Sequence, residues 1–207
     1  MIKENRNETI ITIILAIVIS LAAITVMYVS LPNSSDTHKE NNTNGELPAE
    51  ETILTLIHDD QTLNYTLSDL EGMEAYSGSG SYIKSKLLKQ GTVLIQGSFN
   101  FTGIKVSTLL NGINDLPSDY NITVTSSDGW TNEFTKDQVN GIVNVYNETG
   151  NVTGTSGATM ILAYKEDGEY ITDEEIGPLR IAFVGEGVVT LSSDWAKMVV
   201  SIEVIEV

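Results

Sequence analysis

Arg180 has the clearest capacity for binding chemistry in this sequence. It is the only arginine beyond the first ten residues, and it begins an apolar run that predicts a buried strand. Its guanidinium presents a planar fork of donors that matches a phosphate or a carboxylate. It can equally pair with the acidic loop before it, Asp173 to Glu175, because most such charges find a local partner. The sequence leaves both roles open.

Two other charged groups have the composition of ion-binding sites. Lys84, Lys86 and Lys89 form a cationic run that suits an anion, although a solvated face is the commoner role for such a run. The loop Asp173 to Glu175, together with the carboxylates between residues 166 and 169, offers the hard oxygen ligands that Ca²⁺ takes. It has no EF-hand spacing, so the sequence assigns no metal-binding residue.

The supply of metal ligands and nucleophiles excludes several classes of site. The chain has no cysteine and two histidines, His38 and His58, so it can build neither a structural zinc cluster nor a Cys-His pair. His58 stands beside Asp59 and Asp60, but a single histidine rarely makes a transition-metal site. The sequence has no G-x-S-x-G elbow for a Ser-His-Asp hydrolase. We therefore assign no catalytic residue.

The first 31 residues predict a membrane anchor. Residues 1–9 are expected in the cytoplasm, and the uncharged run at 10–31 is long enough to cross a hydrocarbon core about 30 Å thick as a helix. A cleaved signal peptide is the alternative, but its apolar part is usually shorter, about 7 to 15 residues. Lys3 and Arg6 precede the run and favour a cytoplasmic N-terminus. We expect a single-pass protein of the cell membrane whose C-terminal domain faces the exterior.

The remaining chain divides into a tether and one domain. Residues 32–50 are polar and bracketed by prolines, which predicts a flexible tether to an exterior domain at 51–207. Most Asn-X-Ser/Thr triplets lie beyond the apolar run, which agrees with an exterior location and a glycoprotein. The formal charge of −17 argues against nucleic acid as a partner, because phosphate binding needs a basic stripe. The partners we expect are the membrane, through the N-terminal helix, and a membrane or cell-surface protein.

The pattern within residues 51–207 predicts a β-rich α+β domain with mixed strand pairing. Strands are expected at 52–58, 62–67, 92–95, 120–125, 130–134, 160–164, from 179 onward and at 199–207. Short helices are expected from 68, after a cap at Ser107, and at 136–139, while 77–81 and 147–157 read as loops. Trp130 and Trp195 could line a pocket, although core packing beside turns is the default for both.

Six short motifs follow one another in a recognisable order through the domain. They are TLNYTLSDLEGM, FTGIKVSTLLNGI, VTSSDGWTNEF, LAYKEDGE, GPLRIAF and WAKMVVSIEVIEV. In this order they resemble the oxidoreductase molybdopterin-binding domain of the sulfite oxidase family. The resemblance implies that family's α+β fold, a β-rich mixed-sheet domain, preceded here by one transmembrane helix.

The resemblance also implies where a cofactor would lie. In that family a molybdenum ion on a pyranopterin is ligated by a cysteine of the protein, since a soft thiolate suits this metal. The matching region, Glu74 to Asn100, holds serines but no thiol. Arg180 and Lys197 match the family's cofactor-binding positions, Arg180 on the phosphate side. An asparagine of the family falls here at Glu175 or Ile176, a departure that disfavours an anionic cofactor. We expect no cofactor, with molybdopterin as the group to test.

Three functions follow from these observations. The first is a membrane-anchored extracytoplasmic domain of the molybdopterin-binding fold that acts as a non-catalytic binding or interaction module. The second is a molybdopterin-dependent oxidoreductase domain with a non-cysteine set of metal ligands. The third is a surface-architecture or adhesion protein, suggested by the acidity and the Asn-X-Ser/Thr triplets. The missing thiolate favours a protein that is not an enzyme.

Overall fold

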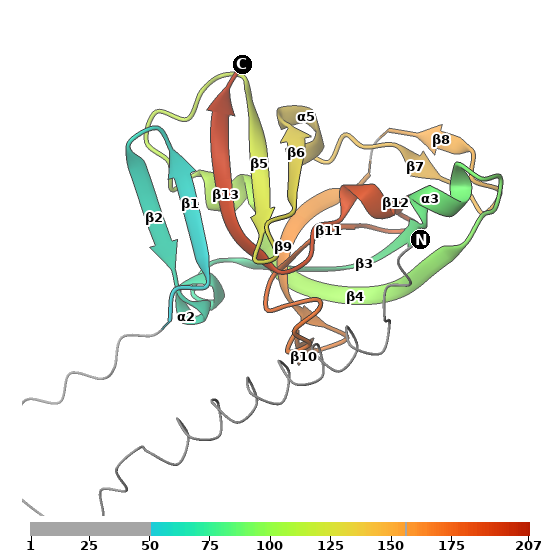
Figure 1. Ribbon diagram of the computed structural model, residues 1–207, viewed down its shortest axis with the longest axis horizontal. Coiled ribbons are helices and arrows are strands. Elements are labelled where there is room, and N and C mark those ends of the chain that lie inside the picture. The colour runs from blue at the N-terminus through green and yellow to red at the C-terminus, as the bar shows by residue number, and fades with distance from the viewer. Residues whose placement is uncertain (1–50, 156) are drawn as a thin grey trace, which may run out of the picture. The chain divides into compact units, whose positions relative to one another are not determined.

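The computed structural model describes residues 51–155 and 157–207. The anchor predicted at 10–31 and the tether predicted at 32–50 lie outside these residues. Within them the chain forms two mixed β-sheets, a small β-hairpin and short helices (Figure 1). Among the described helices, none is long and apolar enough to span a membrane.

The first sheet has five strands in the order β2-β1-β13-β5-β6. They are β1 (Leu54–His58), β2 (Gln61–Tyr65), β5 (Tyr120–Ser126), β6 (Thr131–Thr135) and β13 (Val199–Glu206). The last strand of the chain lies between β1 and β5, parallel to the first and antiparallel to the second. Burial alternates along β1 and β5, as expected for a sheet with one face in the core.

The second sheet has six strands, in the order β10-β9-β4-β3-β12 with β11 also paired to β9. They are β3 (Ala75–Ile83), β4 (Ile95–Lys105), β9 (Thr159–Glu166), β10 (Glu169–Tyr170), β11 (Arg180–Val184) and β12 (Val189–Leu191). In Figure 1 the long strands β3 and β4 run across the picture, while the strands of the first sheet stand upright. Every residue of β11 is buried.

The mixed pairing predicted from the sequence is confirmed. β1 pairs in parallel with β13, and β3 pairs in parallel with β12, whereas the other strand pairs are antiparallel. A separate antiparallel pair joins β7 (Val145–Tyr146) to β8 (Val152–Gly154). The second strand of this pair lies inside the stretch 147–157 that the sequence predicted as a loop throughout.

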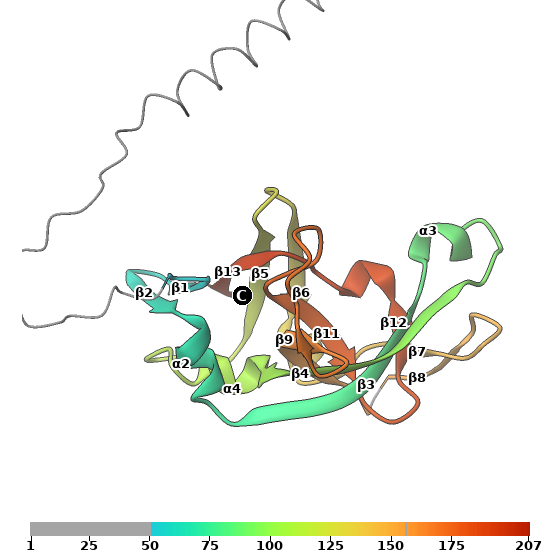
Figure 2. The same ribbon diagram turned by 90° about the horizontal axis from the view of Figure 1, so that it is seen from below.

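The helices are short, as the sequence predicted. They are α2 (Leu67–Glu71), α3 (Ser85–Leu88), α4 (Val106–Leu110), α5 (Lys136–Val139) and the 3-10 helix η1 (Ser192–Asp194). Thr135 caps α5, the helix predicted at 136–139, in a reciprocal pair of hydrogen bonds with Gln138. The predicted cap of α4 is wrong: Lys105, not Ser107, is its N-cap, because β4 continues up to the helix without a break. Figure 2 shows α2 and α4 near one end of β3 and β4.

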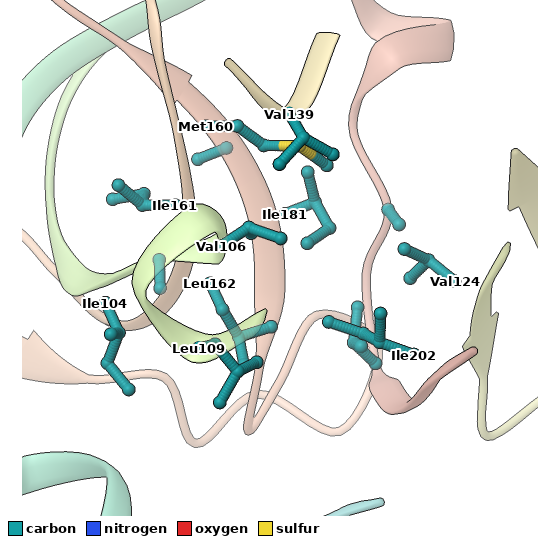
Figure 3. Close-up of a cluster of buried hydrophobic side chains, with 14 of the residues drawn as sticks. Ile104, Val106, Leu109, Val124, Val139, Met160, Ile161, Leu162, Ile181 and Ile202 are labelled. Atoms are coloured by element: carbon teal, nitrogen blue, oxygen red, sulfur yellow. The ribbon is translucent and has the colours of Figure 1, made fainter. Parts of the chain in front are cut away.

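Side chains from both sheets and from helices α2, α4 and α5 form one hydrophobic core, and Figure 3 shows part of it. Leu162 and Ile181 come from β9 and β11, Ile202 comes from β13, and Leu109 comes from α4. All four are almost completely buried. The core therefore ties the first sheet to the second and fixes β11 from both sides.

The predicted loop at 77–81 is wrong, because these residues form the middle of β3. The glycines there are required by close packing. A Cβ on Gly80 would stand 2.5 Å from the carbonyl oxygen of Phe183 and 3.0 Å from the ring of Trp195. Glycine in a strand can mark a close approach of another backbone, and that cause overrides its preference for loops here. The short strand predicted at 92–95 begins only at Ile95 and belongs to the long β4.

Candidate functional site

Arg180 is buried at the start of β11, with 3% of its surface exposed. Its Nη1 donates a hydrogen bond of 2.9 Å to Oε2 of Glu166, at the end of β9. Its guanidinium carbon lies 5.0 Å from the centre of the Phe101 ring and 5.2 Å from that of Trp195. We call these four residues the Arg180 cluster. The guanidinium is therefore held by one carboxylate and by two aromatic rings, which attract a cation.

The partner of Arg180 is not the one that the sequence suggested. The sequence suggested the acidic loop Asp173 to Glu175, but the pairing of β11 with β9 places Arg180 opposite Ala163, and its side chain reaches Glu166 further along β9. The Nε atom is buried and has no hydrogen-bond partner in the described part of the chain. No local sequence signal marks Glu166 or Phe101 as partners, because Glu166 lies 14 residues before Arg180 and Phe101 comes from β4, and only the folded sheet brings them together.

A short segment beside β11 links the two sequence-predicted residues. The backbone N–H of Ile181 donates to the carbonyl of Ala196 at 2.8 Å, and that of Val199 donates to the carbonyl of Leu179 at 2.9 Å. These bonds align the chain from Trp195 to Val199 with the start of β11. Arg180 and Lys197 therefore lie on adjacent segments, but Arg180 is buried and Lys197 is exposed.

Lys197 lines a small cavity beside this segment, which we call the Lys197 cavity. Its volume is about 270 Å³. It is lined by Ser126, Asp128, Trp130, Glu175, Trp195, Lys197 and Met198. Three parts of the chain therefore meet here: the turn between β5 and β6, the acidic loop, and the segment after η1. The Asp-Gly-Trp hairpin signal could have pointed to Trp130, but nothing local indicated what it would face.

Hydrogen bonds hold the wall of the Lys197 cavity in one arrangement. Met198 adopts a positive φ of 50°, a conformation that costs free energy for a residue other than glycine. Its N–H donates to the carbonyl of Ile176 at 2.9 Å, and its carbonyl accepts from the N–H of Ser127 at 2.8 Å. The hydroxyl of Ser126 donates to the carbonyl of Lys197 at 2.5 Å. The indole N–H of Trp195 donates to Thr190 Oγ1 at 2.8 Å, so this ring is fixed as well.

Asp194 lines a second cavity, of about 300 Å³, together with Gln138, Asn144 and Tyr146. Burial raises the pKa of the Asp194 carboxyl above its ordinary value, while a hydrogen bond from the N–H of Leu191, at 3.1 Å, opposes this rise in part. That bond caps η1, so a structural role already accounts for the carboxylate. Consecutive residues line the two cavities, because Asp194 lines this one and Trp195 lines the Lys197 cavity.

The other charged groups predicted as ion sites do not converge. Lys84 lies over the ring of Tyr82 at 5.4 Å, at the start of α3, while Lys86 and Lys89 are exposed along that helix. Asp173 accepts the N–H of Glu175 within its own loop. Among the described residues, no group of three or more His, Asp or Glu side chains is arranged to hold a metal ion.

His58, and serines between Glu74 and Asn100 where the family would carry its cysteine ligand, make contacts within the fold. The ring Nδ1 of His58 lies 3.3 Å from the carbonyl of Val204, and its Nε2 lies 3.9 Å from Asp59. Ser77 shares a hydrogen bond with Thr102 across the β3–β4 ladder. Ser85 bonds to Ser192 and ties α3 to η1. None of these residues belongs to the Arg180 cluster.

Comparison with known proteins supports the fold in its coarse form. No protein-family model matches the chain, and no curated protein matches its sequence. A solved structure, the sulfane dehydrogenase SoxCD from Paracoccus pantotrophus, is similar with a TM-score of 0.53 and 16% identity. The match covers 78% of this chain and 40% of that one. At this identity the likeness shows a related β-rich fold with mixed sheets and assigns no residue a role.

Proposed function

We propose that this protein is a membrane-anchored extracytoplasmic domain of the molybdopterin-binding fold, and that it acts as a non-catalytic binding module. The fold by itself does not decide activity, because one fold carries many functions. The proposal therefore depends on the residues at the positions where the family would hold its cofactor. The observation that carries it is the commitment of Arg180 to internal partners.

Arg180 fits poorly as a phosphate ligand. Its charge is already neutralised by Glu166 at 2.9 Å, and its planar group is covered by Phe101 and Trp195. Its buried Nε lacks a hydrogen-bond partner in the described part of the chain, but Arg180 does not line the Lys197 cavity. A phosphate would have to displace a partly buried carboxylate, which is costly once Arg180 or that carboxylate is left unpaired.

Lys197 fits an anionic cofactor no better. It is exposed, but the cavity beside it also contains Asp128 and Glu175, so two carboxylates accompany the one ammonium. Like charges disfavour the binding of a phosphate dianion. The sequence also lacks the thiol that the family uses as its metal ligand. We therefore infer that the residues present do not fit the cofactor, and we derive no reaction through it.

The rival function is a molybdopterin-dependent oxidoreductase with other metal ligands. It draws support from the fold shared with SoxCD, which is named as a dehydrogenase. Because the chain spans well under half of that protein, the likeness leaves the activity of the whole neighbour open here. Arg180 and Lys197 would be the residues that hold the cofactor in this alternative.

Metal analysis of the purified full chain separates the two functions. The protein would be produced in cells supplied with molybdate and tungstate, then assayed for both metals by mass spectrometry and for pterin by fluorescence after oxidation. A molybdenum enzyme produced in the same cells serves as the control for cofactor supply. We expect no stoichiometric metal or pterin. One metal per chain, lost in an Arg180→Ala variant that still folds, would establish the rival.

Anchoring through residues 10–31 is part of the same proposal and has its own test. The uncharged run supports it by length and hydropathy. We expect the full chain in the membrane fraction, resistant to carbonate extraction, and a variant without residues 10–31 in the supernatant. Protease added outside intact cells should cleave the exterior domain. A full chain that remains in the supernatant would contradict the anchor.

A further inference from the structure

We propose that the Lys197 cavity binds a small zwitterion, a molecule that carries both an ammonium group and a carboxylate. This inference rests on the proposed function, because it names a ligand class for the binding module. Four features of the cavity support it: the charges on its wall, the exposed indole of Trp130, its volume and the rigidity of the wall.

Both signs of charge line the cavity, and they do not neutralise each other. Within the described part of the chain, Lys197 Nζ and the Glu175 carboxylate have neither an ion pair nor a hydrogen bond. Asp128 accepts the N–H of Trp130 with Oδ1 at 2.9 Å, which leaves Oδ2 available. A ligand of one sign would meet a like charge on this wall, whereas a zwitterion finds an opposite charge for each end.

Trp130 gives the cationic end of such a ligand a second attraction. Its side chain is 44% exposed at the turn between β5 and β6, although tryptophan is usually well covered. The face of an indole is the best aromatic partner for an ammonium or quaternary ammonium group. Asp128 lies in the same turn, so its carboxylate and the indole can contact one cation together. Lys197, on the opposite segment, remains for the carboxylate end.

The size and stiffness of the cavity limit the ligand further. At about 270 Å³ the cavity lies just under the range of about 300–1,000 Å³ that is usual for drug-sized ligands, so it suits a molecule the size of an amino acid. The bonds to Met198 and Trp195 hold the wall before any ligand arrives. A preformed wall lowers the entropy cost of binding and favours measurable affinity for a small ligand.

Intrinsic fluorescence offers a direct assay, because the chain has two tryptophans and both line this cavity. The full chain would be titrated with glycine betaine and with β-alanine, two zwitterions that differ in whether the cationic end can donate hydrogen bonds. Choline supplies the cation alone, acetate supplies the anion alone, and glucose supplies a neutral polar ligand. We expect saturable fluorescence change with at least one zwitterion, and binding of choline, acetate and glucose that is weaker by about tenfold or more, because each loses a charge-assisted contact.

Two variants test the assigned contacts against a matched control. Lys197→Met should weaken zwitterion binding by about tenfold or more, since it removes one charged partner. Trp130→Ala should weaken it by a similar factor or less, measured by calorimetry because one fluorophore is lost. Lys89→Met changes an equally exposed lysine outside the cavity wall and should leave the affinity unchanged. Both cavity positions are exposed, so the variants are expected to fold.

Several outcomes would overturn the inference. They are no saturable response to either zwitterion, choline or acetate binding as tightly as the better of the two zwitterions, a preference for glucose, or an unchanged affinity in Lys197→Met. Each of these leaves the metal analysis unaffected. A molybdenum-containing protein would instead overturn the proposed function, so failure of the two ideas can be told apart.

Discussion

The Arg180 cluster and the Lys197 cavity both include Trp195, and they use charge in opposite ways. In the cluster, Arg180 is buried and bonded to Glu166 at 2.9 Å. In the cavity, Lys197 is exposed and has no ion pair in the described part of the chain. One tryptophan ring contributes to both, because it packs against the guanidinium and also lines the cavity.

This difference shows that Arg180 and Lys197, although both match motifs that resemble one family, need not share a role. Arg180 begins a strand that is buried along its whole length, so its charge had to find an internal partner. Lys197 lies in the connection between η1 and β13, where the side chain can point to solvent without such a partner. The first position contributes to stability, and the second is available for a ligand. The following changes test that contrast, from the largest expected effect to the smallest.

Arg180→Ala should lower the free energy of unfolding by about 3 kcal/mol, because it leaves the Glu166 carboxylate without its partner and opens space between two rings. Urea unfolding followed by tryptophan fluorescence measures the loss. The double variant Arg180→Met with Glu166→Gln removes both charges and keeps volume, so it should lose less than half as much. A loss below about 1 kcal/mol in the single variant would show that the cluster is not structural.

Gly80→Ala should lower the free energy of unfolding by about 1–3 kcal/mol, because the added methyl group would be packed too closely against a backbone carbonyl. The added Cβ would stand 2.5 Å from Phe183 O and 3.0 Å from the Trp195 ring. Gly154→Ala is the matched control, since a Cβ there meets no atom within 4 Å. Thermal unfolding of both variants gives the comparison. Equal melting temperatures for the two would contradict the packing explanation for this glycine.

Asp194→Asn should change how the free energy of unfolding varies with pH, by a smaller amount than the two changes above and in a direction that the raised pKa fixes. Burial raises the pKa of this carboxyl above its ordinary value of 3.8, so the folded protein holds the proton more tightly than the unfolded chain does. As pH rises from below 3.8 through the raised pKa, the wild type should therefore lose stability relative to the variant. Urea midpoints at a series of acidic pH values measure this. A difference that stays constant over the series would contradict the raised pKa.

Lys197→Met should leave the free energy of unfolding unchanged within about 0.5 kcal/mol, as is usual for an exposed side chain without a partner. The same urea assay used for Arg180→Ala measures it, and this pair of results gives the sharpest contrast between the two regions. A loss comparable to that of Arg180→Ala would make Lys197 a structural residue and would remove it from the proposed ligand site.

Most of the strands could be predicted from the sequence, because their signals are local. Alternating apolar residues marked 120–125, and Asp128-Gly129 marked the hairpin that follows, where Gly129 has a φ of 85°. The strand β3 was missed for a reason that is not local. Gly80 packs against Phe183 and Trp195, and Gly78 packs against Val184, so the cause of their presence lies far along the chain. Their sequence pattern is the same as that of a flexible loop.

The candidate site could be predicted only in part. The motif order singled out Arg180 and Lys197, and it put both near the same region. It gave no means of finding Glu166 as the partner of the first, nor Asp128, Trp130 and Glu175 as neighbours of the second. These contacts depend on the register of β9 with β11 and on the path of the segment after η1.

The sequence by itself determined the β-rich character of the domain, its acidity and the absence of a thiol, because composition and periodicity are properties of the chain alone. It also contains the uncharged run at 10–31, from which the anchor stays a prediction. Only the tertiary structure decided which charges are satisfied and which remain available. A charge is neutralised when strands distant in sequence pack beside it, and it stays free when they do not. That is why Arg180 and Lys197, both cationic residues matched to the same family, differ in the folded protein: the first is buried and paired, and the second is exposed.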